Sequence, residues 1–313
     1  MRLLSGRFQE RISVVRTEFW MSFAGLVILV AGLITVRKGL ASAPTFAKLI
    51  ALGPVFVAAP LATFAAEHFL FPSGIANGVP TWLPDHLFWV YFVACALIAA
   101  SISLAFEVQL RWSAPLLALL FLLFVTTIHL PNVIHTPHDR IRWSVMLRDS
   151  CFAMGALALT GITLQQKNPA ASKILIHIAR TIIAIALVFF GLEHFLHPEF
   201  APGVPLPKLM PQHVPFRLFW ADLVGAILLV AGIALLINKR TRLCAAIVGL
   251  TMALLTLILF TPIMFSEWGT PQVVEGINYV ADTLLYAGSI LLLAAAMPEM
   301  KRFAPSQTVT ASS

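Results

Sequence analysis

Charged residues are scarce in this sequence. They make up 11% of its 313 residues, whereas hydrophobic residues make up 59% and the mean hydropathy is +0.89. Soluble domains carry about 25% charged residues, so this composition excludes an ordinary soluble protein and predicts a chain embedded in a lipid bilayer. Basic residues outnumber acidic ones, 21 to 14, but no basic run is interleaved with aromatic residues. We therefore exclude nucleic acid as a partner and assign the positive charge to loops that face anionic lipid.

Cysteine is also scarce. The three cysteines, Cys95, Cys151 and Cys244, lie far apart and form no C-x-x-C pair. They therefore define neither a disulfide framework nor a thiolate metal site, and we assign them to apolar packing.

The nine histidines do not define a cofactor site either. The nearest approach to a metal-binding set is His129, His135 and His138 with Asp139, and the repeat described next lacks histidine at the matching position. Haem would need paired histidines on facing helices, which only His68 and His129 could supply. We expect no metal and no intrinsic cofactor.

A short stretch occurs twice and organises the rest of the chain. Residues 64–72, FAAEHFLFP, recur as residues 190–198, FGLEHFLHP. Further matches follow in the same order: Gly78-Val79-Pro80 with Gly203-Val204-Pro205, Pro84 and His86 with Pro211 and His213, and Leu87-Phe88-Trp89 with Leu218-Phe219-Trp220. The offset grows from 126 residues at the Glu-His pair to 131 at the tryptophan. We infer an internal duplication with a short insertion in the second copy.

Nine apolar runs are long enough to cross a bilayer, which takes about 17–25 residues. The first covers residues 19–36, and the others lie near 46–70, 87–106, 113–130, 144–164, 173–196, 217–237, 243–263 and 276–297. The sequence thus predicts an all-α polytopic membrane protein. Its parts are a basic tail and anchor helix at 1–45, a four-helix repeat at 46–166, a second at 167–302 and a disordered tail at 303–313. The four arginines of residues 1–18 favour an amphipathic helix on the membrane surface.

The two repeats should insert in the same orientation, because each crosses the membrane an even number of times. Eleven basic residues then fall in short loops on one side, and four fall on the other side together with the four arginines of the N-terminal tail. The positive-inside rule places the side with eleven, and with it the C-terminus, in the cytoplasm of a cell (inner) membrane. The arginines of the tail favour the reverse orientation. We adopt the orientation that the short loops indicate, which puts the Glu-His pairs in the outer leaflet.

Ionisable residues inside spanning segments are expensive and therefore informative. Here they gather at similar depth, next to the Pro-rich loops, with Arg148 and His129 nearby. The ligand-binding candidates are Glu193, His194, Asp222 and Asp282 in the second copy, and Glu67, His68 and Asp149 in the first. The alternative is a hydrogen-bonded knot that fixes helix register. Because the first copy has Tyr91 in place of Asp222, we expect the second copy to be the active one.

The second copy resembles the four-helix DoxX-like membrane family. The resemblance is carried by Arg180 in its first helix, Gly191 near the end of that helix, the stretch Trp220 to Gly225 that opens the next helix, and the basic turn Lys239 to Arg242. The first copy departs from this pattern with Pro54 and Tyr91 at the positions of Arg180 and Asp222. Members of this family are associated with membrane redox complexes, including a quinone-reducing oxidoreductase.

The resemblance implies an integral membrane module of a redox-linked or respiratory assembly. Such a module would bind a quinone-like or other lipophilic small molecule at the Glu-His-Asp pockets, beside a partner redox subunit or a second copy of the chain. A proton-linked transporter is one alternative, and a structural scaffold subunit without catalysis is the other. The residues name no substrate and no catalytic group.

Overall fold

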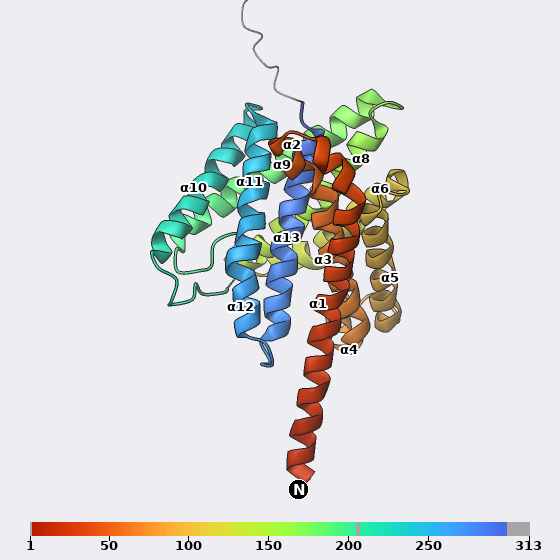
Figure 1. Cartoon of the computed structure of the whole chain (residues 1–313), viewed down its shortest axis with the longest axis vertical. Helices are drawn as coiled ribbons and strands as arrows, with labels where there is room; N and C mark the ends of the chain where they lie inside the picture. Colours follow the sequence, from red (N-terminus) through yellow and green to blue (C-terminus); the bar gives the residue numbers. More distant parts are fainter. Residues whose placement is uncertain (1, 205–206, 299–313) are drawn as a thin grey trace, which may run out of the picture.

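The computed structural model describes residues 2–204 and 207–298, with side chains from residue 18 onward. The regular secondary structure of the described chain is all helical, with one isolated bridge in a loop, so the predicted all-α membrane fold is confirmed (Figure 1). The elements are α1 (Arg2–Ser42), α2 (Thr45–Ala51), α3 (Gly53–Leu70), α4 (Pro72–Ala76), α5 (His86–Ala105), α6 (Leu110–Phe124), η1 (Val125–His129), α7 (Leu130–His135), α8 (Arg140–Leu164), α9 (Pro169–Leu196), α10 (Arg217–Leu236), α11 (Thr241–Leu255), η2 (Thr256–Phe260), α12 (Thr261–Ser266) and α13 (Val273–Ala296). The predicted tail at 303–313 lies outside the described residues.

Nine helical segments of the described chain are long and apolar enough to cross a membrane. Three of the crossings combine several elements: α2 with α3, α6 with η1 and α7, and α11 with η2 and α12. The first helix differs from the prediction. Residues 2–18 do not form a separate surface helix but continue α1, which projects beyond the rest of the molecule at its N-terminal end (Figure 1).

The backbone repeats itself between the two halves of the chain. Non-glycine residues with positive φ recur 131 residues apart: Asp85 and Phe216, Glu107 and Asn238, Gln109 and Arg240. The π-helical turns η1 and η2 are separated by the same 131 residues. These shared irregularities support the inferred duplication, because unusual backbone conformations are tolerated only where the surroundings enforce them.

One detail of the sequence alignment is wrong. The Trp89 indole N–H donates to the Pro84 carbonyl at 3.0 Å, and the Trp220 indole N–H donates to the Pro215 carbonyl at 3.1 Å. Pro84 therefore corresponds to Pro215 and not to Pro211. The extra residues of the second copy lie before this point, in the loop after α9.

The two copies are interleaved. Within a copy, the first helix packs on the second and the third packs on the fourth, but α3 and α8 have no pair of described Cα atoms within 8 Å. Instead α13 packs along α3, α8 packs along α9, and α8 and α13 pack against each other. Each fourth helix thus contacts the first helix of the other copy, and α13 runs through the middle of the molecule (Figure 1).

Small residues permit these crossings. A Cβ atom built on Gly155 of α8 would lie 2.6 Å from the Cα of Ser289 in α13, and one built on Gly288 would lie 2.7 Å from the backbone nitrogen of Val57 in α3. The two glycines occupy matching positions in the two copies but serve different contacts: Gly155 permits the close approach of α8 to α13, and Gly288 permits that of α13 to α3.

Candidate functional site

A cavity of about 430 Å³ lies in the first copy, within the size range of small-molecule sites. It is enclosed by the end of α3, the loop after α4, the start of α5, the end of α6 and η1. Its walls are mostly apolar and aromatic, and its polar side chains are two histidines and a threonine. The lining residues are His68, Ile75, Gly78, Val79, Pro80, Trp82, Leu83, Trp89, Val90, Phe92, Val93, Leu120, Leu123, Phe124, Thr127, Ile128 and His129.

A π-helical turn brings His129 to this cavity. Pro131, two residues after the end of η1, has no amide hydrogen to give to the preceding turn, and its ring would clash with the carbonyl four residues earlier. The extra residue in the π turn relieves that conflict. His129, the last residue of η1, therefore points its ring between the cavity and α8, where it meets Asp149.

Behind His129 runs a chain of buried charged groups. The Nε2 atom of His129 is 2.8 Å from Oδ2 of Asp149, and Nε of Arg148 donates to Oδ1 of the same carboxylate at 2.9 Å. The Arg148 Nη1 atom then donates to Oδ2 of Asp282 at 2.6 Å. Asp149 and Asp282 are the matching acids of the two copies, so one guanidinium joins them across the α8–α13 contact.

The two Glu-His pairs make different contacts. Glu67 accepts a hydrogen bond from Asn278 Nδ2 of α13 at 3.0 Å, and Glu193 forms an ion pair with Arg140 Nη1 of α8 at 3.3 Å. Each carboxylate is therefore bonded to the fourth helix of the other copy. Sequence reasoning missed Arg140 and Asn278, because the interleaving that brings them close leaves no mark on residue spacing.

The histidines of the two Glu-His pairs each make the same kind of hydrogen bond to a backbone carbonyl four residues earlier. His68 Nδ1 lies 2.8 Å from the Phe64 carbonyl, and His194 Nδ1 lies 2.6 Å from the Phe190 carbonyl. Since a carbonyl only accepts, Nδ1 carries the proton in both rings. In the second copy the other ring nitrogen, Nε2 of His194, accepts from the backbone N–H of Gly203 at 2.8 Å.

The longer loop of the second copy fills the corresponding space. Ala201 to Val204 and Met210 are buried, and the space bounded by Arg140, Glu193 and His194 is about 10 Å³, room for about one water molecule. The open cavity beside the Glu-His pair thus belongs to the first copy and not to the second, which we expected to be the active one.

Asp222 does not join the cluster as expected. It is exposed on α10 and forms no hydrogen bond or ion pair with any described residue. Its expected position came from counting residues along the helix, and that count says nothing about which way the side chain faces. Arg180, in contrast, is buried and donates from Nη1 to the Leu235 carbonyl at 2.6 Å, which satisfies a free carbonyl at the end of α10.

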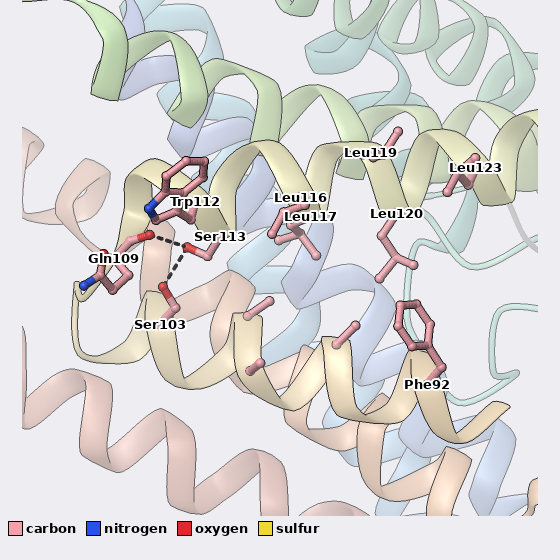
Figure 2. Close-up of a pocket in the computed structure, with 13 residues that line it drawn as sticks. Phe92, Ser103, Gln109, Trp112, Ser113, Leu116, Leu117, Leu119, Leu120 and Leu123 are labelled. Atoms are coloured by element: carbon pink, nitrogen blue, oxygen red, sulfur yellow. Dashed lines mark hydrogen bonds between the residues drawn. The ribbon is translucent and has the colours of Figure 1, made fainter. Parts of the chain in front are cut away.

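A second cavity, of about 450 Å³, continues the first along the groove between α5 and α6 (Figure 2). Phe92, Leu120 and Leu123 line both cavities. The second is apolar along its length and ends near the α5–α6 turn, where Ser103 donates to Ser113 at 2.6 Å. The two cavities together form one groove with histidines at one end only.

Small residues line the groove of the first copy. Ala96 and Ala99 of α5 lie along it, and 131 residues later the second copy carries Ile227 and Val230. The second copy has its own hollow of about 750 Å³ at the α10–α11 turn, and Val230 is one of the residues that line it.

The described residues contain no group of three or more His, Cys, Asp or Glu side chains arranged to hold a metal ion. Comparison with protein-family models, curated proteins and solved structures finds no match to this chain. The class of protein is therefore set by the fold: a multi-pass, all-α membrane protein with nine potential spans in its described residues.

Proposed function

We propose that this protein is an integral membrane module of a redox-linked assembly that binds a lipophilic ring compound of the quinone class in the first copy. The observation that carries the proposal is the continuous groove, apolar along α5 and α6 and bounded at one end by His68 and His129. A ring with polar substituents suits the histidine end, and an apolar tail suits the rest. Electrons would pass to or from a partner subunit, in keeping with the resemblance to the DoxX-like family.

The apolar walls favour a lipophilic ligand over a transported ion. An ion in such a cavity would lose its hydration without enough polar groups to replace it. The charged chain through Arg148 lies behind His129, between helices, where it is bonded to protein groups on both sides. We assign this series of charged groups a structural role, which is to hold α8, α13 and His129 in place. The hydrogen-bonded knot and the binding site are then neighbours, and both are present.

We also propose that the Glu-His ends face the outside of a cell (inner) membrane and that the C-terminus is cytoplasmic. The basis is the excess of basic residues in the short loops on the opposite side, among them Lys239 and Arg240 between α10 and α11.

Filling the cavity tests the proposed function. Thr127 lines it, and its duplicate 131 residues later, Ile258, is exposed on η2. Binding of a tritium-labelled decyl benzoquinone, in its oxidised and reduced forms, would be measured on protein in lipid nanodiscs. We expect Thr127→Trp to weaken binding of the better-bound form at least tenfold and Ile258→Trp to leave it unchanged. The proposal would be refuted if the unaltered protein showed no saturable binding of either form, or if the two variants bound equally well.

A further inference from the structure

In the second copy, a backbone group of the protein occupies the place beside the histidine ring that a ligand could occupy in the first copy. In the second copy the backbone N–H of Gly203 reaches His194 Nε2 at 2.8 Å, and the loop that carries it fills the space beside the ring. That hydrogen bond requires a lone pair on Nε2, so the imidazole is neutral. His68 repeats the backbone bond to a carbonyl four residues earlier, which fixes the same tautomer in the first copy.

Gly78, which matches Gly203 in the sequence, makes no such bond to His68, because its backbone N–H donates to the Ile75 carbonyl at 2.9 Å. The loop of the first copy is shorter, His68 lines the cavity, and no donor in the described residues reaches its Nε2 atom. A charged imidazolium would be costly beside so apolar a wall. The ring therefore presents a hydrogen-bond acceptor to whatever enters the cavity.

Two of the donors that line the cavity are already used, while the indole N–H of Trp82, a residue that is 68% exposed, makes no bond to a described residue. The Trp89 indole N–H donates to the Pro84 carbonyl at 3.0 Å, and the Thr127 hydroxyl donates to the Leu123 carbonyl at 2.6 Å. A ligand that only accepts hydrogen bonds, such as an oxidised quinone, would meet the His68 lone pair with its own lone pairs. A ligand with a hydroxyl group would satisfy it.

Resting on the proposed function and making it more specific, we infer that the first-copy cavity selects a lipophilic phenol or hydroquinone whose hydroxyl donates to His68 Nε2, with its apolar tail along α5 and α6. Within the quinone class, the reduced form is then the preferred ligand. His68 acts here as a specificity-determining residue that touches the ligand.

A pair of redox-inert probes tests this inference. Para-nonylphenol and its methyl ether have the same ring and tail, but only the phenol can donate. Their affinities would be measured in nanodiscs by competition with the labelled benzoquinone or its hydroquinone, whichever binds better. We expect the phenol to bind roughly tenfold more tightly, since an unsatisfied buried acceptor costs on the order of one hydrogen bond. We expect His68→Phe to remove this preference and His68→Gln, which keeps an acceptor, to retain part of it.

The outcomes separate the two proposals. Equal affinities of the two probes for the unaltered protein would overturn the inference about His68 and leave lipophilic binding intact. A phenol preference that persists in a folded His68→Phe variant would overturn it as well. If neither probe nor the benzoquinone pair binds in a saturable way, the proposed function itself fails. A phenol preference lost in His68→Phe and partly kept in His68→Gln would support both.

Discussion

At the scale of single residues, the buried charges are held by partners from the other copy. Arg148 lies between Asp149, its neighbour in sequence, and Asp282, more than a hundred residues away. Its side chain is 15% exposed, so neither carboxylate has much access to water if the guanidinium is removed. Removing one partner of a buried ion pair is far more damaging than replacing the whole set with neutral groups.

We therefore expect Arg148→Met to lower the free energy of unfolding by about 3–5 kcal/mol, because it leaves the buried Asp282 without a counter-charge and Asp149 with His129 as its remaining partner. The triple variant Arg148→Met, Asp149→Asn, Asp282→Asn should recover part of the loss. Arg142→Met removes an ion pair with Asp139 whose side chains are 41% and 40% exposed, and should cost less than about 1 kcal/mol. Thermal unfolding in detergent, followed by circular dichroism, would measure the order of the variants. An Arg148→Met protein as stable as the Arg142→Met protein would contradict this account.

Which residues would be polar and buried could be predicted, but not their partners. Glu193, His194, Asp149 and Asp282, which were chosen from the sequence by their depth in apolar helices, are buried, and Glu67 and His68, chosen in the same way, are half-buried. Depth along a helix follows from counting residues, since the rise per residue is fixed. The direction in which a side chain points depends on how the helix is rotated against its neighbours. Asp222 was chosen by the same count of residues along its helix, but its side chain is exposed.

At the scale of helices, the crossing of α8 and α13 depends on glycine. A Cβ atom on Gly155 would lie 2.5 Å from the Ser289 Cβ and 2.6 Å from its Cα, so the two backbones would have to separate. Gly39 in α1 provides a matched control, because nothing lies within 4 Å of the Cβ atom that it would gain.

We expect Gly155→Ala to destabilise the protein by about 1–3 kcal/mol through overpacking. Gly39→Ala should be neutral or stabilising by about 0.5–1 kcal/mol, because alanine is the better helix former. Comparing the thermal stabilities of the two purified variants would check both signs. A Gly155→Ala protein at least as stable as the Gly39→Ala protein would show that the α8–α13 contact tolerates separation.

The presence and approximate bounds of the nine apolar helices could be predicted from the sequence, but the π turns within two of them could not. Each of the nine apolar runs lies in a helical segment that is long and apolar enough to cross a membrane, because helices are the open-chain structure that satisfies its own backbone groups in lipid. The π turns η1 and η2 were not foreseen, although Pro131 and Pro262 each lie two residues after one of them and matching prolines in two copies were a usable signal. The histidine end of the cavity depends on η1, so the position of His129 in the cavity wall could not be predicted without predicting that turn.

At the scale of the whole molecule, the boundary between the copies is a boundary in sequence but not in packing. The first copy leaves one face of α3 to be covered by α13, and the second leaves one face of α9 to be covered by α8. A single four-helix copy would expose to lipid the surfaces that the other copy now covers, including the ion pair between Arg148 and Asp282. Duplication has therefore produced one interleaved bundle in place of two independent bundles.

Dividing the chain between Gln166 and Lys167, in the turn that joins α8 and α9, tests this interleaving. We expect fragments 1–166 and 167–313 to co-purify through a tag on either one when they are made together, because each supplies the helix that covers the first helix of the other. Made alone, fragment 167–313 should be degraded or should pair with itself, with α13 of one molecule on α9 of the next. Co-purification and the mass of the purified species by light scattering would distinguish these results. A stable monomer of fragment 167–313 with full helix content would contradict the interleaved packing, since α9 would then need no partner from outside its own copy.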